Sequence, residues 1–163
     1  MRGAQARPRC GFPSLLPGFL PLILLASLLA GALAFADEHS VESGDILRLV
    51  YHVDSADPGE FSLVLRYLKE HVVSDGPEAL DARVVLHGDG VRLLEAGSIG
   101  TATAVELDTL RLQGVEFLVS RRSLEARGLE RSDLHDVLRD EVVSSGITEL
   151  YRLQRKGFSY IKP

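Results

Sequence analysis

The sequence predicts one α/β domain built in three layers, with helices on both faces of a largely parallel five-stranded sheet. Strand-like and helix-like segments alternate from residue 45 to residue 163, which is the pattern of βαβ units. The first strand-like segment, residues 46–53, is almost entirely apolar, as is typical of a strand covered on both faces. The length of 163 residues and a charged fraction of 25% fit a single globular domain and argue against a two-domain enzyme or a disordered chain.

The clearest element after this first strand is a helix that begins at Asp57. Asp57 is a typical N-cap residue, and Pro58 suits the first helical position, where its missing N–H is not needed. Apolar side chains then recur at helical spacing as far as Val72, and the Gly76-Pro77 pair ends the helix. The segment is therefore expected to be an amphipathic helix that covers the sheet.

The remaining elements continue the same alternation. Further strands are predicted at residues 83–87, 115–119, 141–143 and 158–161. Helices are predicted at residues 91–96 and 103–113 and from Ser145 to Gly157. A further helix is expected to begin at Ser123. Because parallel strands are joined by helical crossovers, this order implies a parallel sheet with helices on both faces.

Residues 1–36 are expected to be a secretory signal peptide that does not belong to the folded domain. Three arginines precede an apolar stretch, and residues 34–36 (Ala-Phe-Ala) form a small-x-small cleavage pattern. Residues 37–44 are then a flexible lead-in to a domain that spans residues 45–163. The sequence thus predicts a periplasmic or secreted protein with no membrane association after cleavage. An uncleaved anchor is the alternative, because residues 20–36 approach the roughly 17-residue minimum for a bilayer span.

Charge and cysteine content limit the classes of function. The formal net charge is −5, and cleavage would remove three of the 18 basic residues and none of the 23 acidic ones, leaving −8. A chain this acidic lacks the electrostatic footprint of a nucleic-acid binder. The one cysteine, Cys10, lies in the predicted signal peptide, so the mature domain would contain neither a disulfide nor a cysteine-based zinc site.

The residues that follow the predicted strands have the first claim on function, because open parallel sheets bind ligands at the carboxyl ends of their strands. The candidates for a ligand pocket are His52 and Asp54 after the first strand, His87 and Asp89 after the second, and Ser120, Arg121 and Arg122 after the third. No Walker loop or Gly-x-Gly-x-x-Gly motif follows the first strand, so the usual phosphate cradle of nucleotide-binding proteins is missing.

The His-x-Asp pattern occurs twice, at His52/Asp54 and His87/Asp89, and imidazole with carboxylate is a normal metal-ligand combination. A structural role is the favoured interpretation, because aspartates readily bond backbone N–H groups in turns and histidines can support those loops. The sequence therefore predicts no metal site and no cofactor.

Two further arrangements of candidate residues are weaker evidence for a functional site. Arg121 and Arg122 offer charge for a small anion, although two solvated arginines on a loop, or an interface salt bridge, is the favoured interpretation. A Ser-His-Asp triad can be assembled nominally around Ser120, but no Gly-x-Ser-x-Gly elbow surrounds this serine.

Five segments, taken in order, resemble the DsrE/DsrF-like family. They are residues 49–54 (LVYHVD), 85–92 (VLHGDGVR), 114–117 (GVEF), 143–147 (VSSGI) and 157–163 (GFSYIKP). The resemblance implies a compact α/β domain with a five-stranded parallel sheet that commonly assembles into homotrimers or hexamers. It also implies that sulfur-relay members carry persulfide sulfur on a cysteine just after the third strand. Here that position is Ser120.

A serine hydroxyl is neither acidic enough nor soft enough to hold a persulfide, so Ser120 cannot carry sulfur. We therefore expect an exported, non-catalytic, oligomeric binding or accessory protein linked to sulfur or redox metabolism, with a small anion or sulfur compound as ligand. The alternatives are a sulfurtransferase-type carrier that works through a partner's thiol and a hydrolase that uses Ser120.

Overall fold

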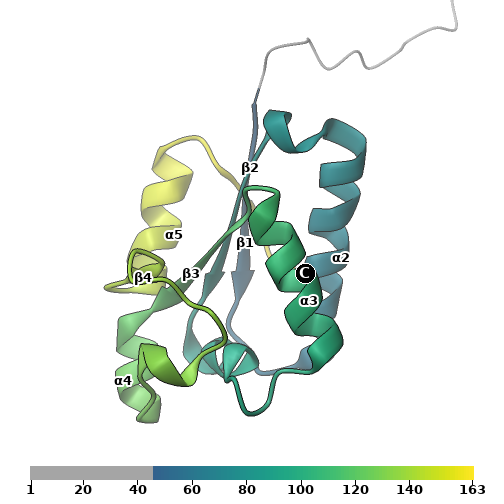
Figure 1. The fold of residues 1–163 in the computed structure, drawn as a ribbon. Helices are drawn as coiled ribbons and strands as arrows, with labels where there is room; N and C mark the ends of the chain where they lie inside the picture. The colour runs from purple at the N-terminus through teal and green to yellow at the C-terminus, as the bar shows by residue number, and fades with distance from the viewer. Residues whose placement is uncertain (1–45) are drawn as a thin grey trace, which may run out of the picture. The chain divides into compact units, whose positions relative to one another are not determined.

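The computed structural model describes residues 46–163, which form a five-stranded parallel sheet between two helical layers (Figure 1). This confirms the predicted fold class. The predicted signal peptide, residues 1–36, and the lead-in, residues 37–44, lie outside the described residues. None of the helices within residues 46–163 combines the length and apolar character of a membrane span.

The strands and helices lie close to their predicted positions. The strands are β1 (Leu47–Val53), β2 (Leu80–Leu86), β3 (Glu116–Ser120), β4 (Val142–Val143) and β5 (Ser159–Ile161). The α-helices are α2 (Pro58–Asp75), α3 (Thr101–Leu112), α4 (Arg121–Arg127) and α5 (Gly146–Arg155). Three short 3₁₀ helices are η2 (Pro77–Ala79), η3 (Gly88–Leu94) and η4 (Arg131–Asp133).

Several predicted boundaries differ from the structure by one to three residues, and the helix expected at residues 91–96 is the 3₁₀ helix η3, Gly88–Leu94. The second strand begins at Leu80 rather than at residue 83, because Leu80 and Asp81 continue the parallel register with Leu47 and Arg48. The helix expected near Ser123 begins two residues earlier, because the Ser120 side chain caps it by accepting a hydrogen bond from the Ser123 N–H.

The strands lie in the order β4-β3-β2-β1-β5, and all neighbouring strands run parallel. The first strand is therefore internal, with β2 on one side and β5, the last strand, on the other. Because the strands are parallel, the carboxyl ends of β1, β2 and β3 meet at one edge of the sheet.

The two faces of the sheet have different partners. Helices α2 and α3 cover one face and α5 covers the other (Figure 1). On the α2/α3 face, the strand side chains are apolar: Leu49, Tyr51, Val53, Ala82, Val84, Leu86, Phe117 and Val119. The smaller apolar cluster on the α5 face consists of Val50, Val85, Leu118, Leu150, Leu153 and Phe158.

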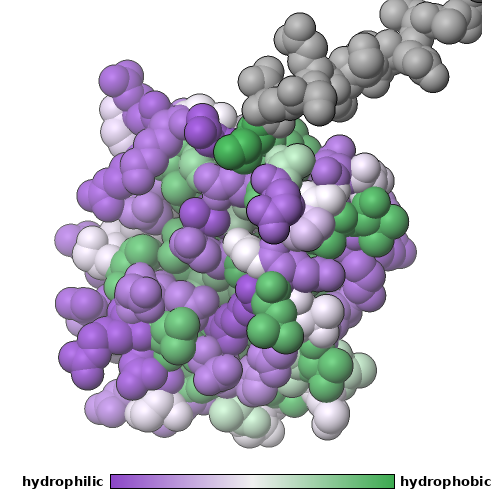
Figure 2. All heavy atoms as spheres, turned by 45° about the horizontal axis from the view of Figure 1, so that its top comes forward, coloured by the Kyte–Doolittle hydropathy of each residue, from purple (hydrophilic) through white to green (hydrophobic). Residues whose placement is uncertain are grey.

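The residues on the α5 face change in type from the amino ends to the carboxyl ends of the strands. At the amino ends, Arg83 pairs with Asp81 at 2.7 Å and with Glu116 at 3.0 Å. In Figure 2, whose view turns this end of the molecule forward, hydrophilic residues predominate and hydrophobic ones appear as separate spots. The apolar cluster occupies the middle of the face. At the carboxyl ends, alternation of side chains brings His52 and Ser120 onto the same face, two residues after Val50 and Leu118.

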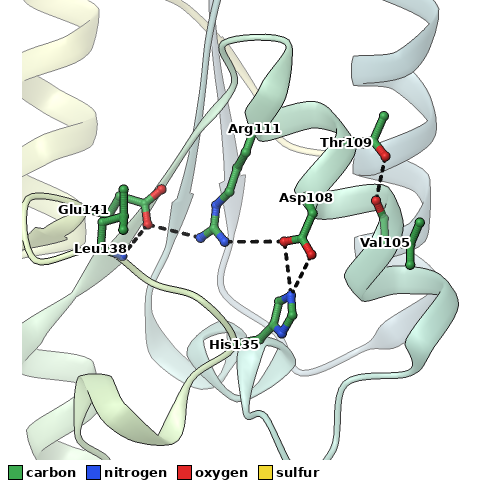
Figure 3. A network of polar contacts seen from close by, with 7 residues as sticks. All are labelled: Val105, Asp108, Thr109, Arg111, His135, Leu138 and Glu141. Carbon is green, nitrogen blue, oxygen red and sulfur yellow. Dashed lines mark hydrogen bonds and ion pairs between the residues drawn. The ribbon is translucent and has the colours of Figure 1, made fainter.

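A partly buried ion-pair network joins α3 to the segment before β4 (Figure 3). The Arg111 guanidinium donates to Glu141 at 3.1 Å, and the same Glu141 oxygen accepts the Leu138 N–H at 2.8 Å. Asp108 on α3 contacts His135 Nε2 at 3.1 Å. This network stabilises the long connection between β3 and β4 and lies apart from the candidate residues predicted from the sequence.

Candidate functional site

The strongest concentration of polar side chains at the carboxyl ends of the strands is the histidine cluster, which we define as His52, Asp54 and His87. The Nε2 atoms of the two histidines lie 2.5 Å apart. An oxygen of Asp54 lies 3.8 Å from the His52 Nε2. One ligand atom from each of the three residues falls within 4.8 Å of the others. The structure thus brings together three of the seven candidates.

Parallel register explains why the two histidines meet. His52 is on β1 directly opposite Val85 of β2, and His87 follows β2 by one residue. Both side chains point to the α5 face, and no strand lies between β1 and β2, so the two rings approach each other at the edge of the sheet. The ring centroids lie 4.6 Å apart with an interplanar angle of 18°.

The surroundings of the two histidines disfavour the charged form of both rings. His52 has only 7% of its surface exposed, and His87 is half-buried. Burial lowers the pKa of both imidazoles, and for His52 the neighbouring His87 lowers it further. Neutral imidazole nitrogens can donate or accept a hydrogen bond, or bind a cation.

Two residues from the end of the chain complete the surroundings of the cluster. The Tyr160 hydroxyl lies 2.6 Å from the His52 Nδ1, and the Lys162 ammonium donates to Asp54 at 2.6 Å. The hydrogen bond from Lys162 lowers the pKa of the Asp54 carboxyl, which therefore stays ionised. Neither Tyr160 nor Lys162 was among the predicted site residues. The register that pairs Val50 with Tyr160 places this tyrosine beside His52.

Ser120 lies on the same face but has a different environment. It is 2% exposed, and its hydroxyl accepts the Ser123 N–H at 3.4 Å as the N-cap of α4. Among the hydrogen bonds within residues 46–163, none joins Ser120 to a histidine. The structure therefore does not assemble the nominal Ser-His-Asp triad.

The first residue of α5 lies directly over this part of the sheet. A Cβ atom added to Gly146 would lie 2.6 Å from the His87 Cβ and 3.4 Å from the Ser120 Cβ. Such a 2.6 Å contact is too short for any side chain, so glycine allows the α5 N-terminus to pack against both residues. Helix α5 thereby limits the space available beside the histidine cluster.

The other three candidates do not join the cluster. Asp89 is an exposed carboxylate that forms an ion pair with Arg127 at 2.8 Å. Arg121 and Arg122 are exposed on the first turn of α4, and Arg121 borders a separate hollow that also contains Glu125. The structure therefore supports a site built from residues of β1, β2 and β5, with the arginines outside it.

The chain is similar to known proteins over most of its length. The model of the DsrE/DsrF-like family matches residues 48–163. A solved structure of a protein of unknown function, MTH1491 from Methanobacterium thermoautotrophicum, is 29% identical with a TM-score of 0.60, covering 72% of this chain and 99% of that one. The ychN protein from E. coli is 21% identical with a TM-score of 0.55, covering 72% and 100%, and supports the fold alone. No curated protein matches the chain significantly.

Proposed function

The chain belongs to the DsrE/DsrF-like family, and from this premise we propose that it is a non-catalytic member that binds a small ligand at the carboxyl ends of its strands. The observation that carries the proposal is the environment of Ser120. This residue occupies the position at which the sequence resemblance places the sulfur-carrying cysteine. It is buried, and its hydroxyl caps a helix. A hydroxyl in that role has neither the thiolate needed for a persulfide nor a base to activate it.

The ligand-binding part of the proposal rests on the histidine cluster and its neighbours. Two neutral imidazoles, a tyrosine hydroxyl and the Lys162 ammonium supply hydrogen-bond donors within a small region. Such donors suit a small anion or sulfur compound of the kind expected from the sequence. The proposed role is that of an accessory protein in sulfur or redox metabolism.

Export and oligomerisation complete the proposal. Export is supported by the signal-peptide pattern of residues 1–36. Oligomerisation is supported by two large apolar side chains on α5, Ile147 and Tyr151, which are 60% and 65% exposed and lie one helical turn apart. A second copy of the chain is the partner that we propose for this surface. Light scattering that detects only monomer at micromolar concentration would contradict it.

Persulfide labelling tests the non-catalytic part of the proposal. The purified protein is incubated with a sulfane-sulfur donor and then with a persulfide-specific reagent. We expect no stable sulfur adduct within residues 46–163, which contain no cysteine. A fluorophosphonate probe should likewise leave Ser120 unmodified. A sulfur adduct in this region, or a probe adduct that disappears in Ser120→Ala, would overturn this part of the proposal.

Thermal-shift measurements with sulfite and thiosulfate test the binding part. A ligand present at about 100 times its dissociation constant stabilises the folded state by roughly 2.7 kcal/mol, which is a readily measured shift. We expect at least one of the two anions to raise the melting temperature, and His87→Gln to abolish the shift. His71→Gln is the matched control, because His71 also lies near a carboxylate, that of Asp75, but on α2. No shift with either anion would remove this part of the proposal.

A further inference from the structure

The geometry of the histidine cluster leads us to propose that His52, Asp54 and His87 bind one divalent transition-metal ion such as Zn²⁺ or Co²⁺. This inference deepens the proposed binding function and rests on it for the location of the ligand site: three protein ligands leave the ion an open coordination position, at which the proposed small anion would bind. It departs from the expectation drawn from the sequence, which favoured a purely structural role for both His-x-Asp pairs. Nitrogen from imidazole and oxygen from carboxylate together form a common ligand set for zinc, nickel, cobalt and iron.

The two Nε2 atoms face each other at 2.5 Å, closer than the ~2.9 Å typical of a hydrogen bond donated by N–H. One shared proton fits between them at this distance, and a cation can take the place of that proton only if the two rings move apart. A cation is favoured over a proton when both Nε2 atoms present lone pairs. The contacts of the His52 ring allow its Nε2 atom to do so.

The contact with Tyr160 bears on the tautomer of His52. When the Nδ1 of this ring carries the proton and donates to the Tyr160 hydroxyl at 2.6 Å, the lone pair must lie on Nε2. Histidines that bind metals almost always donate from the second ring nitrogen in this way, because the contact fixes the ring and increases the basicity of the ligand. Tyr160 is thus a positioning residue for the site.

The distances within the histidine cluster are close to those between the ligands of a metal ion. With metal–nitrogen bonds of about 2.0–2.1 Å, two ligands in tetrahedral geometry lie ~3.3 Å apart. The two Nε2 atoms would separate by just under 1 Å from their 2.5 Å spacing, and the Asp54 oxygen would close from 3.8 Å. Both changes require side-chain movement at Asp54 and His87, which lie just beyond the ends of β1 and β2.

Lys162 opposes the metal at the same site. Its ammonium donates to the Asp54 oxygen that lies nearest to His52. A cation bound by the cluster would be repelled by this charge and would compete with it for the carboxylate. Removal of the Lys162 charge should therefore strengthen metal binding, an effect that a purely structural histidine pair would not produce.

Titration of the purified, untagged protein with Zn²⁺ and, separately, with Co²⁺ tests the proposal. Calorimetry reports stoichiometry and affinity, and the visible absorption of Co²⁺ reports nitrogen and oxygen coordination. We expect one ion per chain, a loss of affinity of at least 100-fold in His52→Gln and His87→Gln, and about tenfold in Asp54→Asn. Tyr160→Phe should weaken binding by about 10–100-fold through the orientation of His52. Lys162→Gln should tighten it several-fold.

The matched control is His135→Gln, because His135 also contacts a carboxylate, that of Asp108, at 3.1 Å but outside the cluster. The metal affinity of His135→Gln should remain within twofold of that of the parent protein. Equal affinity in the parent protein and in His52→Gln, or weaker binding in Lys162→Gln, would overturn the proposal. If His52→Gln does not fold, the affinities of Tyr160→Phe and Lys162→Gln still decide whether the metal site exists.

The failure of the metal site can be distinguished from the failure of the proposed function. Stabilisation by sulfite or thiosulfate without any metal binding would refute the metal site alone, whereas a persulfide adduct with metal bound would refute only the non-catalytic role.

Discussion

The two faces of the sheet differ in how their residues are used. Every strand side chain in the α2/α3 core is apolar, and most are completely buried. The α5 face carries ion pairs at the amino ends of the strands, a small apolar cluster in the middle and the histidine cluster at the carboxyl ends. The α2/α3 face therefore holds most of the buried apolar side chains, which leaves the α5 face free to hold polar groups at its carboxyl edge.

Two leucines on neighbouring strands test this division directly. Leu86 is fully buried on the α2/α3 face, whereas Leu118 is 7% exposed on the α5 face. We expect Leu86→Ala to lower the free energy of unfolding by about 4 kcal/mol and Leu118→Ala by about 2 kcal/mol, since the cost of a cavity depends on how fully the site is enclosed. Urea unfolding measures both values. Equal losses would mean that the two faces contribute alike.

The ion-pair network around Arg111 is a set of partly buried polar side chains beside the apolar α2/α3 face. Glu141→Gln removes the charge that pairs with Arg111 at 3.1 Å and leaves a guanidinium with little solvent around it. Breaking one partner of a buried pair is costly, so we expect a loss of about 3 kcal/mol in the free energy of unfolding. Glu116→Gln, which alters an exposed ion pair with Arg83, is the control and should cost about 1 kcal/mol or less. A similar loss in both variants would contradict our account of the network.

Tyr51 and His52 are consecutive residues on opposite faces, and Tyr51 gives the apolar face a pH dependence. Burial raises the pKa of Tyr51 to about 12. Above pH 10 the unfolded chain loses this proton and the folded chain does not, so the tyrosine contributes stability that is lost as pH rises from 10 to 12. We expect the parent protein to lose about 2 kcal/mol more than Tyr51→Phe over this range, measured by urea unfolding. Parallel pH profiles would show that the hydroxyl is not shielded.

The smallest expected effect concerns Ser120, on the α5 face. If its role is to cap α4, Ser120→Ala should cost about 1 kcal/mol, and Ser120→Thr should recover most of that loss. Neither change should weaken Zn²⁺ binding by more than twofold, because Ser120 is not a ligand in the proposed site. Metal titration and thermal unfolding of the two variants measure both quantities. Loss of metal binding in Ser120→Ala would extend the functional region across to β3.

Local sequence signals predicted most of the fold and three of the five residues of the site. Apolar runs located the strands, and the rule that ligands bind at strand ends singled out His52, Asp54 and His87. The contact between the two histidines was not predictable, because it depends on the register between β1 and β2. Tyr160 and Lys162 were missed for a related reason. Their place beside β1 is fixed by the crossover through α5, which no local pattern encodes.

The pairing of β5 with β1 has a consequence for folding. The last strand and the residues after it make two contacts with the site, Tyr160 with His52 and Lys162 with Asp54. Each contact joins residues that are 108 positions apart in the chain. Contacts between residues so distant in sequence form slowly, because the intervening chain must first be ordered. Tyr160 and Lys162 can therefore contact the histidine cluster only once β5 has paired with β1. These two contacts would report on whether folding has reached completion.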